Sequence, residues 1–268
     1  MYTASISQKF PGLFLILLDQ SSSMQDSFGR CTRAEAAAEA INTVIHEIQL
    51  SCEKGDKIVD RCSVGVIVYG AKVAPIMACP ISEVENQIVE YRRCKKGDLR
   101  CAGGVYPVDY SLPIWVRPVA AGSTPMHRAF EQATAIVTRW SELHPSSFPA
   151  VVINITDGEP DKVDLTLVAA QQLKSTGTND GKTLLFNVHI GDGHSTGELM
   201  LPSTLPENSS HYARLLFDLS SVLPGSMVEA AVRLGFAAKP NSRGYVYNAS
   251  ESSLVRFIEF GSSSMKLR

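Results

Sequence analysis

Runs of apolar residues alternate along the chain with segments of helical periodicity. Residues 13–18 are six large hydrophobic residues that end at Asp19, which predicts a buried parallel strand delivering an acid to the carboxyl edge of a sheet. Residues 151–156 form a second such run, which ends at Asp157 and is followed by Gly158. Further strands are predicted at residues 62–69, 114–119, 183–190 and 244–248.

Apolar residues recur at helical spacing between these strands. Thr32 and Glu35 match a capping box, and the stripe of residues 34–48 that follows leaves Arg33 on the polar side. Thr124 and Pro125 predict the N-cap and first residue of a second helix. Further helices are predicted at residues 165–173, capped by Asp161 or Asp164, at about 227–234 and at about 251–260.

This alternation predicts the fold class. Strands separated by helices pair in parallel through right-handed crossovers. We therefore expect a single α/β domain over residues 1–268, with a doubly wound, mostly parallel sheet and helices on both faces. Residues 92–113 and 192–242 do not fit the minimal pattern and are interpreted as insertions, which are usually functional or mobile when this long. Residues 212–224, within the second, are apolar enough to predict packing on the core or over a binding surface.

Composition and charge indicate which cellular compartment and which classes of partner to expect. The chain has 268 residues, 19% of them charged, and a net charge of −2, so it offers no basic surface for nucleic acid. Its start lacks the features of a secretory signal, and no apolar run approaches the ~18 residues of a membrane span. We expect a soluble, cytoplasmic protein without nucleic-acid or membrane partners. Its six cysteines are then expected to be free thiols, although Cys94 and Cys101 could pair or bind zinc.

Three loops that follow predicted strands carry oxygen ligands. Asp19, Ser21 and Ser23 occupy alternate positions after the first strand, Thr124 precedes a helix, and Asp157 ends another strand. In an open α/β sheet such loops share one edge, and carboxylate and hydroxyl oxygens suit a hard cation such as Mg²⁺. Each residue alone has a structural explanation as a turn or cap residue. Their combination predicts a metal site.

The combination also resembles a known family. D-x-S-x-S at residues 19–23, Thr124 within Gly-Ser-Thr-Pro, and Asp157-Gly158 resemble, in order and rough spacing, the metal-ion-dependent adhesion site (MIDAS) of the von Willebrand factor A (vWA) domain family. The resemblance covers most of the chain. It implies the vWA fold and one divalent cation, Mg²⁺ first and Mn²⁺ or Ca²⁺ as alternatives.

The resemblance further implies a function without catalysis. Asp19, Ser21, Ser23, Thr124 and Asp157 would hold the cation, and a partner protein would supply an Asp or Glu to it. A looser similarity to stand-alone bacterial vWA proteins, including those linked to tellurium resistance, suggests a partner in a protein kinase or phosphatase system.

Two other functions stay open. A Mg²⁺-dependent phosphoryl-transfer or hydrolytic enzyme would also place an acid after the first strand, but such enzymes pair it with a second Asp where this chain has Ser21. Phosphate-loop, nucleophile-elbow, zinc-protease and dinucleotide motifs are absent from the sequence. The chain could also be a structural scaffold with a vestigial site. His127 is interpreted as an exposed surface residue, and Glu159 and Asp161 as solvated acids.

Overall fold

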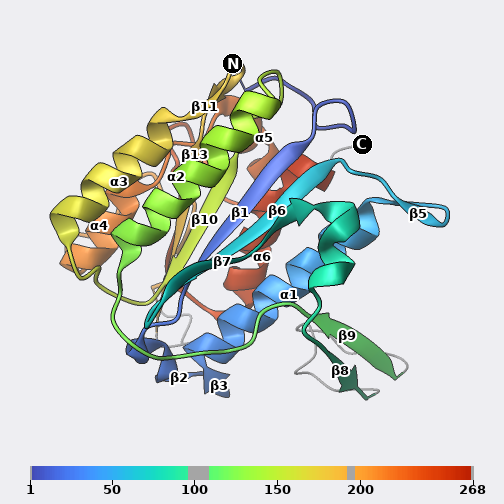
Figure 1. Ribbon diagram of the computed structural model, residues 1–268. Coiled ribbons are helices and arrows are strands. Elements are labelled where there is room, and N and C mark those ends of the chain that lie inside the picture. Colours follow the sequence, from blue (N-terminus) through green and yellow to red (C-terminus); the bar gives the residue numbers. More distant parts are fainter. Residues whose placement is uncertain (1, 96–108, 192–196, 267–268) are drawn as a thin grey trace.

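A mostly parallel sheet forms the centre of the computed structural model, which describes residues 2–95, 109–191 and 197–266 (Figure 1). Its seven described strands lie in the order β14 (Leu199–Met200), β15 (Tyr245–Ala249), β13 (Leu184–Ile190), β10 (Val151–Thr156), β1 (Gly12–Asp19), β6 (Cys62–Tyr69) and β7 (Val73–Pro80). The five inner strands are parallel, and β14 and β7 are antiparallel strands at the two edges. The predicted sheet class is confirmed.

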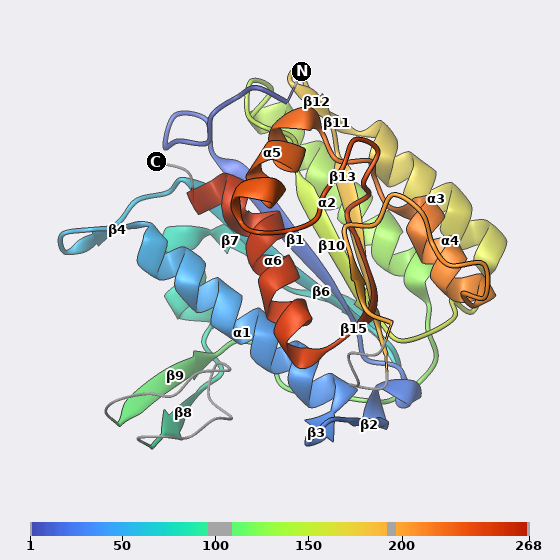
Figure 2. The ribbon, with the colours of Figure 1, turned by 180° about the vertical axis from the view of Figure 1, so that it is seen from behind.

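Helices cover both faces of the sheet, as β1 illustrates. Its alternate residues Leu13, Leu15 and Leu17 belong to one buried cluster, and Phe14, Ile16 and Leu18 to another, because successive side chains of a strand point to opposite faces. The first face is covered by α2 (Met126–Leu143), α3 (Val163–Ser175) and α4 (His211–Leu219), and the second by α1 (Arg33–Ser51), α5 (Gly225–Arg233) and α6 (Glu251–Lys266) (Figures 1 and 2).

The start of α1 follows the sequence prediction. Thr32 accepts a hydrogen bond from the Glu35 backbone N–H, and the Glu35 carboxylate accepts one from the Thr32 N–H, so the capping box is confirmed. The apolar stripe predicted for α3, which was Leu165, Val168, Ala169 and Leu173, is confirmed only for its last two residues. Leu165 and Val168 are exposed, whereas Thr166, Ala169, Ala170 and Leu173 are buried.

The strand predicted at residues 114–119 is wrong. The backbone N–H groups of Trp115 and Val116 both donate to Asn42 Oδ1, and the Val116 carbonyl accepts from Asn42 Nδ2. A side chain of α1 thus replaces the hydrogen bonds that a neighbouring strand would make. The observed strand β9 (Tyr110–Ile114) ends where this segment begins and pairs with β8 (Glu90–Cys94) in a separate hairpin.

The β8–β9 hairpin lies within the first stretch interpreted as an insertion, and residues 96–108 of that stretch are outside the described residues. Cys94 is disulfide-bonded, so the expectation of a free thiol is wrong there. The hairpin buries only a small cluster of Cys94, Leu112 and Ile114, and so small a core gains from a covalent cross-link. Cys31, Cys52, Cys62 and Cys79 are thiols and not disulfide-bonded, as expected; Cys101 lies outside the described residues.

The described part of residues 192–242 contains β14, α4 and α5. Leu215, Leu216 and Leu219 of α4 are buried in the cluster shared with α2 and α3, so the predicted packing on the core is confirmed for this helix. Three short hairpins are β2 (Ser27–Phe28) with β3 (Cys31–Thr32), β4 (Glu53–Lys54) with β5 (Lys57–Ile58), and β11 (Gly177–Thr178) with β12 (Gly181–Lys182); two 3₁₀ helices are η1 (Ser22–Gln25) and η2 (Ile81–Gln87).

None of the helices in the described ranges is both long and apolar enough to cross a membrane.

Candidate metal centre

Asp19 ends β1 at the carboxyl edge of the sheet and is fully buried. One carboxylate oxygen accepts the Ser21 backbone N–H at 2.8 Å, and the other accepts the Thr156 hydroxyl at 2.6 Å. Burial raises the pKa of Asp19 to about 6, and the charge of Asp157 adds to the shift. Thr156, at the end of the neighbouring strand β10, was not singled out by the sequence analysis because it continues the apolar run.

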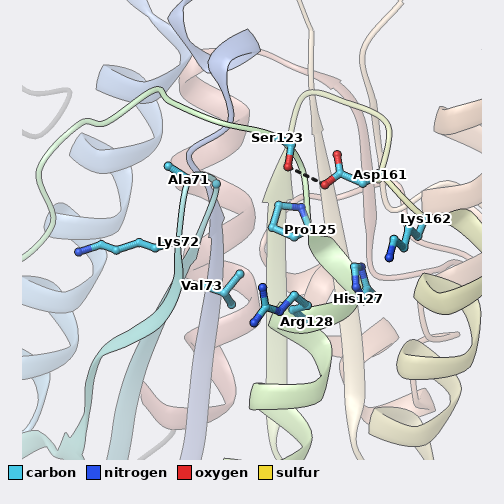
Figure 3. Close-up of a pocket in the computed structure, with 10 residues that line it drawn as sticks. Ala71, Lys72, Val73, Ser123, Pro125, His127, Arg128, Asp161 and Lys162 are labelled. Carbon is cyan, nitrogen blue, oxygen red and sulfur yellow. Dashed lines mark hydrogen bonds between the residues drawn. The ribbon is translucent and has the colours of Figure 1, made fainter.

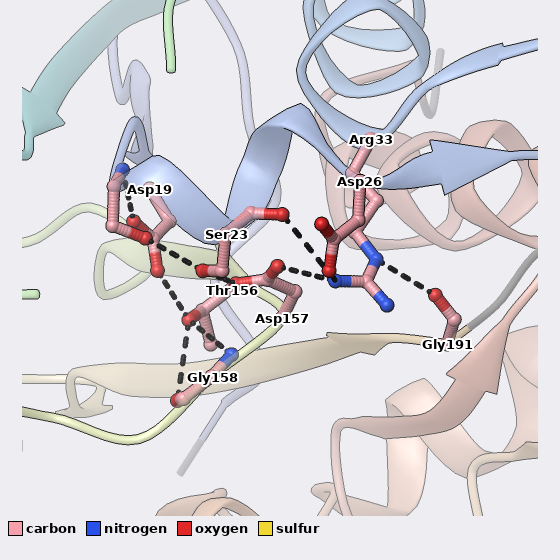
Figure 4. Close-up of polar contacts among 9 residues, drawn as sticks. Asp19, Ser23, Asp26, Arg33, Thr156, Asp157, Gly158 and Gly191 are labelled. Atoms are coloured by element: carbon pink, nitrogen blue, oxygen red, sulfur yellow. Dashed lines mark hydrogen bonds and ion pairs between the residues drawn. The ribbon is translucent and has the colours of Figure 1, made fainter. Parts of the chain in front are cut away.

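A chain of hydroxyl and carboxylate oxygens lies beside Asp19 (Figure 4). The Ser21 and Ser23 hydroxyl oxygens are 3.1 Å apart, and the Ser23 hydroxyl donates to Asp157 Oδ1 at 2.8 Å. Neighbouring ligands of an octahedral Mg²⁺ are separated by about 2.9 Å, because its metal–oxygen distance is about 2.1 Å. The spacing of these three oxygens therefore fits adjacent positions around such an ion.

Thr124 lies on a neighbouring loop and makes no direct hydrogen bond to the other four predicted ligands. This loop is joined to the first by backbone bonds from Ser22 N–H to the Gly122 carbonyl and from Ala121 N–H to the Gln20 carbonyl. Gly122 has a φ of 89°, and a Cβ there would lie 2.4 Å from the Ala71 nitrogen. The close approach of the Thr124 loop to the turn between β6 and β7 thus depends on glycine.

The prediction that Thr124 caps α2 is wrong. The helix begins at Met126 with Pro125 at the N-cap, and no side chain caps it. Asp161 instead fixes Thr124, since its carboxylate accepts the Thr124 N–H at 2.8 Å and the Ser123 hydroxyl at 2.7 Å, while its N–H donates to the Thr124 carbonyl. The Thr124 hydroxyl has no hydrogen-bond partner within the described ranges, which leaves its oxygen free for a cation. Asp161, interpreted from the sequence as a solvated acid, positions the loop.

Arg33, predicted on the polar side of α1, makes contacts that the sequence did not indicate. Its guanidinium donates to Asp157 Oδ2 at 2.7 Å and to Asp26 at 2.9 Å, and its Nε donates to the Gly191 carbonyl at 3.0 Å (Figure 4). The side chain is 17% exposed and that of Asp157 is 0% exposed. Arg33 therefore compensates the buried charge of Asp157 and leaves the other carboxylate oxygen to Ser23.

Two histidines lie near these loops. His127 is only 8% exposed, so its interpretation as a surface residue is wrong. His189, near the end of β13, is mostly buried, and burial lowers its pKa to about 4, with Arg33 also lowering it and Asp157 opposing the shift. No group of three or more His, Cys, Asp or Glu side chains suited to a metal occurs in the described part of the chain. Any metal at this edge would have to use serine and threonine hydroxyls.

Comparisons with known proteins define the fold but not the family. No family model matches the chain, and no curated protein sequence matches it. Among solved structures it is similar to the pilus adhesin SpaC from Lactobacillus rhamnosus GG, with 11% identity and a TM-score of 0.57 over 96% of this chain and 31% of the adhesin. It is also similar to proximal thread matrix protein 1 from the mussel byssus, with 12% identity and a TM-score of 0.52 over 98% of this chain and 47% of that protein.

The chain thus spans about a third to a half of the proteins that it resembles in structure. Identities this low show a shared fold alone. With the sheet order and the two helical layers described above, the likeness confirms the predicted doubly wound, mostly parallel α/β fold.

Proposed function

We propose that this chain is a metal-dependent protein-binding module. In the proposal a divalent cation, Mg²⁺ first, is held by Asp19, Ser21, Ser23, Thr124 and Asp157, and a partner's Asp or Glu completes its coordination. The observation that carries the proposal is the spacing of Ser21 Oγ, Ser23 Oγ and Asp157 Oδ1, at 3.1 and 2.8 Å. The loop of these serines is hydrogen-bonded to the loop of Thr124, whose hydroxyl has no partner among the described residues.

The charges at the site favour an acidic partner. Serine and threonine hydroxyls are neutral ligands and leave the cation most of its charge, and Arg33 already shares the charge of Asp157. A cation in this setting keeps a strong attraction for a further carboxylate, which would form a charge-assisted contact across the interface. One such contact gives little affinity, so the surrounding loops would supply contact area and specificity.

Binding is favoured over phosphoryl transfer by the state of Asp19. That residue would be the nucleophile of an Asp-dependent enzyme, yet it is fully buried and both of its oxygens accept hydrogen bonds. Ser21 stands where a second acid would be needed for proton transfer. The hydrogen bonds to Asp19 thus support a binding role over an attacking one.

Isothermal calorimetry with Mg²⁺ and with Mn²⁺ tests the metal site. Wild type should bind one ion, and Asp19→Ala and Thr124→Ala should each abolish saturable binding while circular dichroism stays native. Ser22→Ala is the matched control, because the Ser22 hydroxyl donates to the Gly122 carbonyl and not to the cluster. Wild-type protein without saturable binding at millimolar metal would contradict the proposal.

Affinity capture tests the mode of recognition. Wild-type protein immobilised with Mg²⁺ should retain a partner that EDTA releases, and a Thr124→Ala column should not retain it. The first candidates to look for are a protein kinase and a metal-dependent phosphatase, because the sequence loosely resembles stand-alone bacterial vWA proteins, some of which are linked to tellurium resistance. A partner held equally by both columns would place recognition on another surface.

A further inference from the structure

A depression of about 280 Å³ lies beside the Thr124 loop. Its walls come from the turn between β6 and β7, from the first turn of α2 with the residues before it, and from the segment that leads into α3 (Figure 3). Ser123 and Pro125, which flank the proposed ligand Thr124, both belong to the lining. The depression therefore adjoins the proposed metal centre.

Three of the four charged side chains that line this depression are cationic. Lys72, Arg128 and Lys162 are exposed, and none of the three has an ion pair with any described residue. Among the described residues, the one acid in the lining is Asp161, whose two carboxylate oxygens already accept hydrogen bonds from Thr124 and Ser123. Three cations against one engaged carboxylate make the depression electropositive, although the whole chain carries a net charge of −2.

A second, independent observation at this depression is the Nδ1 atom of His127, which is unpaired among the described residues. His127 lines the depression and is 8% exposed, and within the described ranges its buried Nδ1 atom has no hydrogen-bond partner. A buried polar atom without a partner is costly. The first turn of α2, which carries His127, adds the partial positive charge of a helix N-terminus.

We propose that this depression binds an anionic group, a carboxylate or a phosphate, of the same partner segment that reaches the metal. The proposal deepens the proposed function and rests on it for the identity of the partner, although the depression's own affinity for anions does not need the metal. A partner segment with two anionic groups close together would place one on the cation and the other among Arg128, Lys162 and His127. In Figure 3 the Lys72 side chain extends away from the other labelled residues, so its contribution is the smallest.

Titration of ¹⁵N-labelled protein, observed by NMR in EDTA at constant ionic strength, tests the proposal with two probes. Inorganic phosphate and acetate should each be tried. At least one should give saturable shifts at the amides of Ala71, His127 and Arg128. Tighter binding of phosphate would indicate a phosphorylated segment, and preference for acetate an Asp- or Glu-rich one.

Variants separate this site from general attraction to positive charge. Arg128→Ala and Lys162→Ala should each weaken binding by about fivefold, as expected for loss of a charge-assisted bond, and Lys72→Ala by about twofold. Arg139→Ala is the matched control, since Arg139 is an exposed cation on the same helix outside the depression.

Two outcomes would overturn the inference. One is the absence of saturable shifts at the three amides with either probe, and the other is an Arg139→Ala effect as large as that of Arg128→Ala. Because the titration is done without metal, either outcome is distinct from failure of the metal site, which the calorimetry reports separately.

Discussion

The two sides of the candidate site differ in whether their positive charges are paired with acids. On the Asp157 side, Arg33 is largely buried and paired with two acids. On the Thr124 side, Lys72, Arg128 and Lys162 are exposed and lack acidic partners in the described structure. The difference indicates that the fold neutralises charge where burial would make an unpaired group costly, and leaves it unneutralised where a ligand can reach it.

Removal of the Arg33 guanidinium should have the largest effect on stability. Arg33→Gln leaves the 0% exposed carboxylate of Asp157 without its ion pair, so the free energy of unfolding in EDTA should fall by about 3 kcal/mol. Added Mg²⁺ should stabilise this variant more than wild type, because the cation can take over the charge of Asp157. Urea denaturation with and without Mg²⁺ measures both effects.

Arg117→Gln is the control for that experiment. Arg117 and Glu90 form an ion pair of 2.9 Å, but their side chains are 61% and 50% exposed. Loss of an exposed pair should change stability by less than about 1 kcal/mol. Equal losses in the two variants would remove the proposed difference between buried and exposed charge.

The second largest effect on stability is expected from acidification, through His189, whose ring is influenced by Arg33 and Asp157. The pKa of His189 is lowered by burial to about 4, from a usual 6.5, so the native state keeps this ring neutral while the unfolded chain protonates it. Its contribution to stability is complete above pH 6.5 and is lost as the pH falls toward 4, at up to about 1.4 kcal/mol per pH unit.

Comparison with His189→Asn isolates this effect. An Asn oxygen can replace His189 Nδ1 as the acceptor for the Asn248 N–H but does not titrate. Asp19 acts in the opposite sense, because its raised pKa favours the folded state as the pH falls from about 6, and this term is common to both proteins. Urea denaturation between pH 7 and pH 4.5 measures the free energy of unfolding of both proteins. It should fall less steeply with pH in His189→Asn than in wild type. Equal slopes in the two proteins would contradict the role given to His189.

A smaller loss of stability is expected from substitution of Asp161. Asp161→Ala removes the acceptor for Thr124 N–H and Ser123 Oγ, which should cost about 1 kcal/mol and weaken Mg²⁺ binding by loosening the Thr124 loop. Asp164→Ala is the control, because Asp164 lies in the first turn of α3 and should contribute only a few tenths of a kcal/mol through the helix dipole. Unchanged Mg²⁺ affinity in Asp161→Ala would show that the loop holds its position without this carboxylate.

The unpaired cations should matter least for stability. Arg128→Ala and Lys162→Ala should leave the free energy of unfolding within about 0.5 kcal/mol of wild type, because neither side chain has an ion pair with a described residue to lose. Thermal denaturation checks this. A loss above about 1 kcal/mol would mean that these side chains support the fold, and the contrast with Arg33 would fail.

Features that depend on local periodicity were predictable from sequence. The apolar run before Asp19 and the pairing of Thr32 with Glu35 each involve neighbouring residues, and both appear in the structure as expected. Asp19, Ser21, Ser23 and Asp157 come together because parallel strands end at one edge of the sheet.

Features that depend on contacts between distant residues were not predictable. Arg33 falls on the polar side of α1 by periodicity, yet it faces Asp157, 124 residues away in sequence. Asp161 reaches the Thr124 loop across 37 residues, and Asn42 holds the backbone of Val116 across 74 residues. Sequence periodicity places a residue on the polar side of a helix, but it does not distinguish a side chain that contacts water from one that contacts a distant loop.

The two edge strands of the sheet have a consequence for self-association. β14 has only two residues, and β7 contains Pro75 and Pro80, which have no N–H to offer to an incoming strand. Exposed edges with free N–H groups are the usual templates for aggregation and for capture of extended peptides. The short β14 and the two prolines of β7 thus hinder the addition of a further strand at either edge of this sheet.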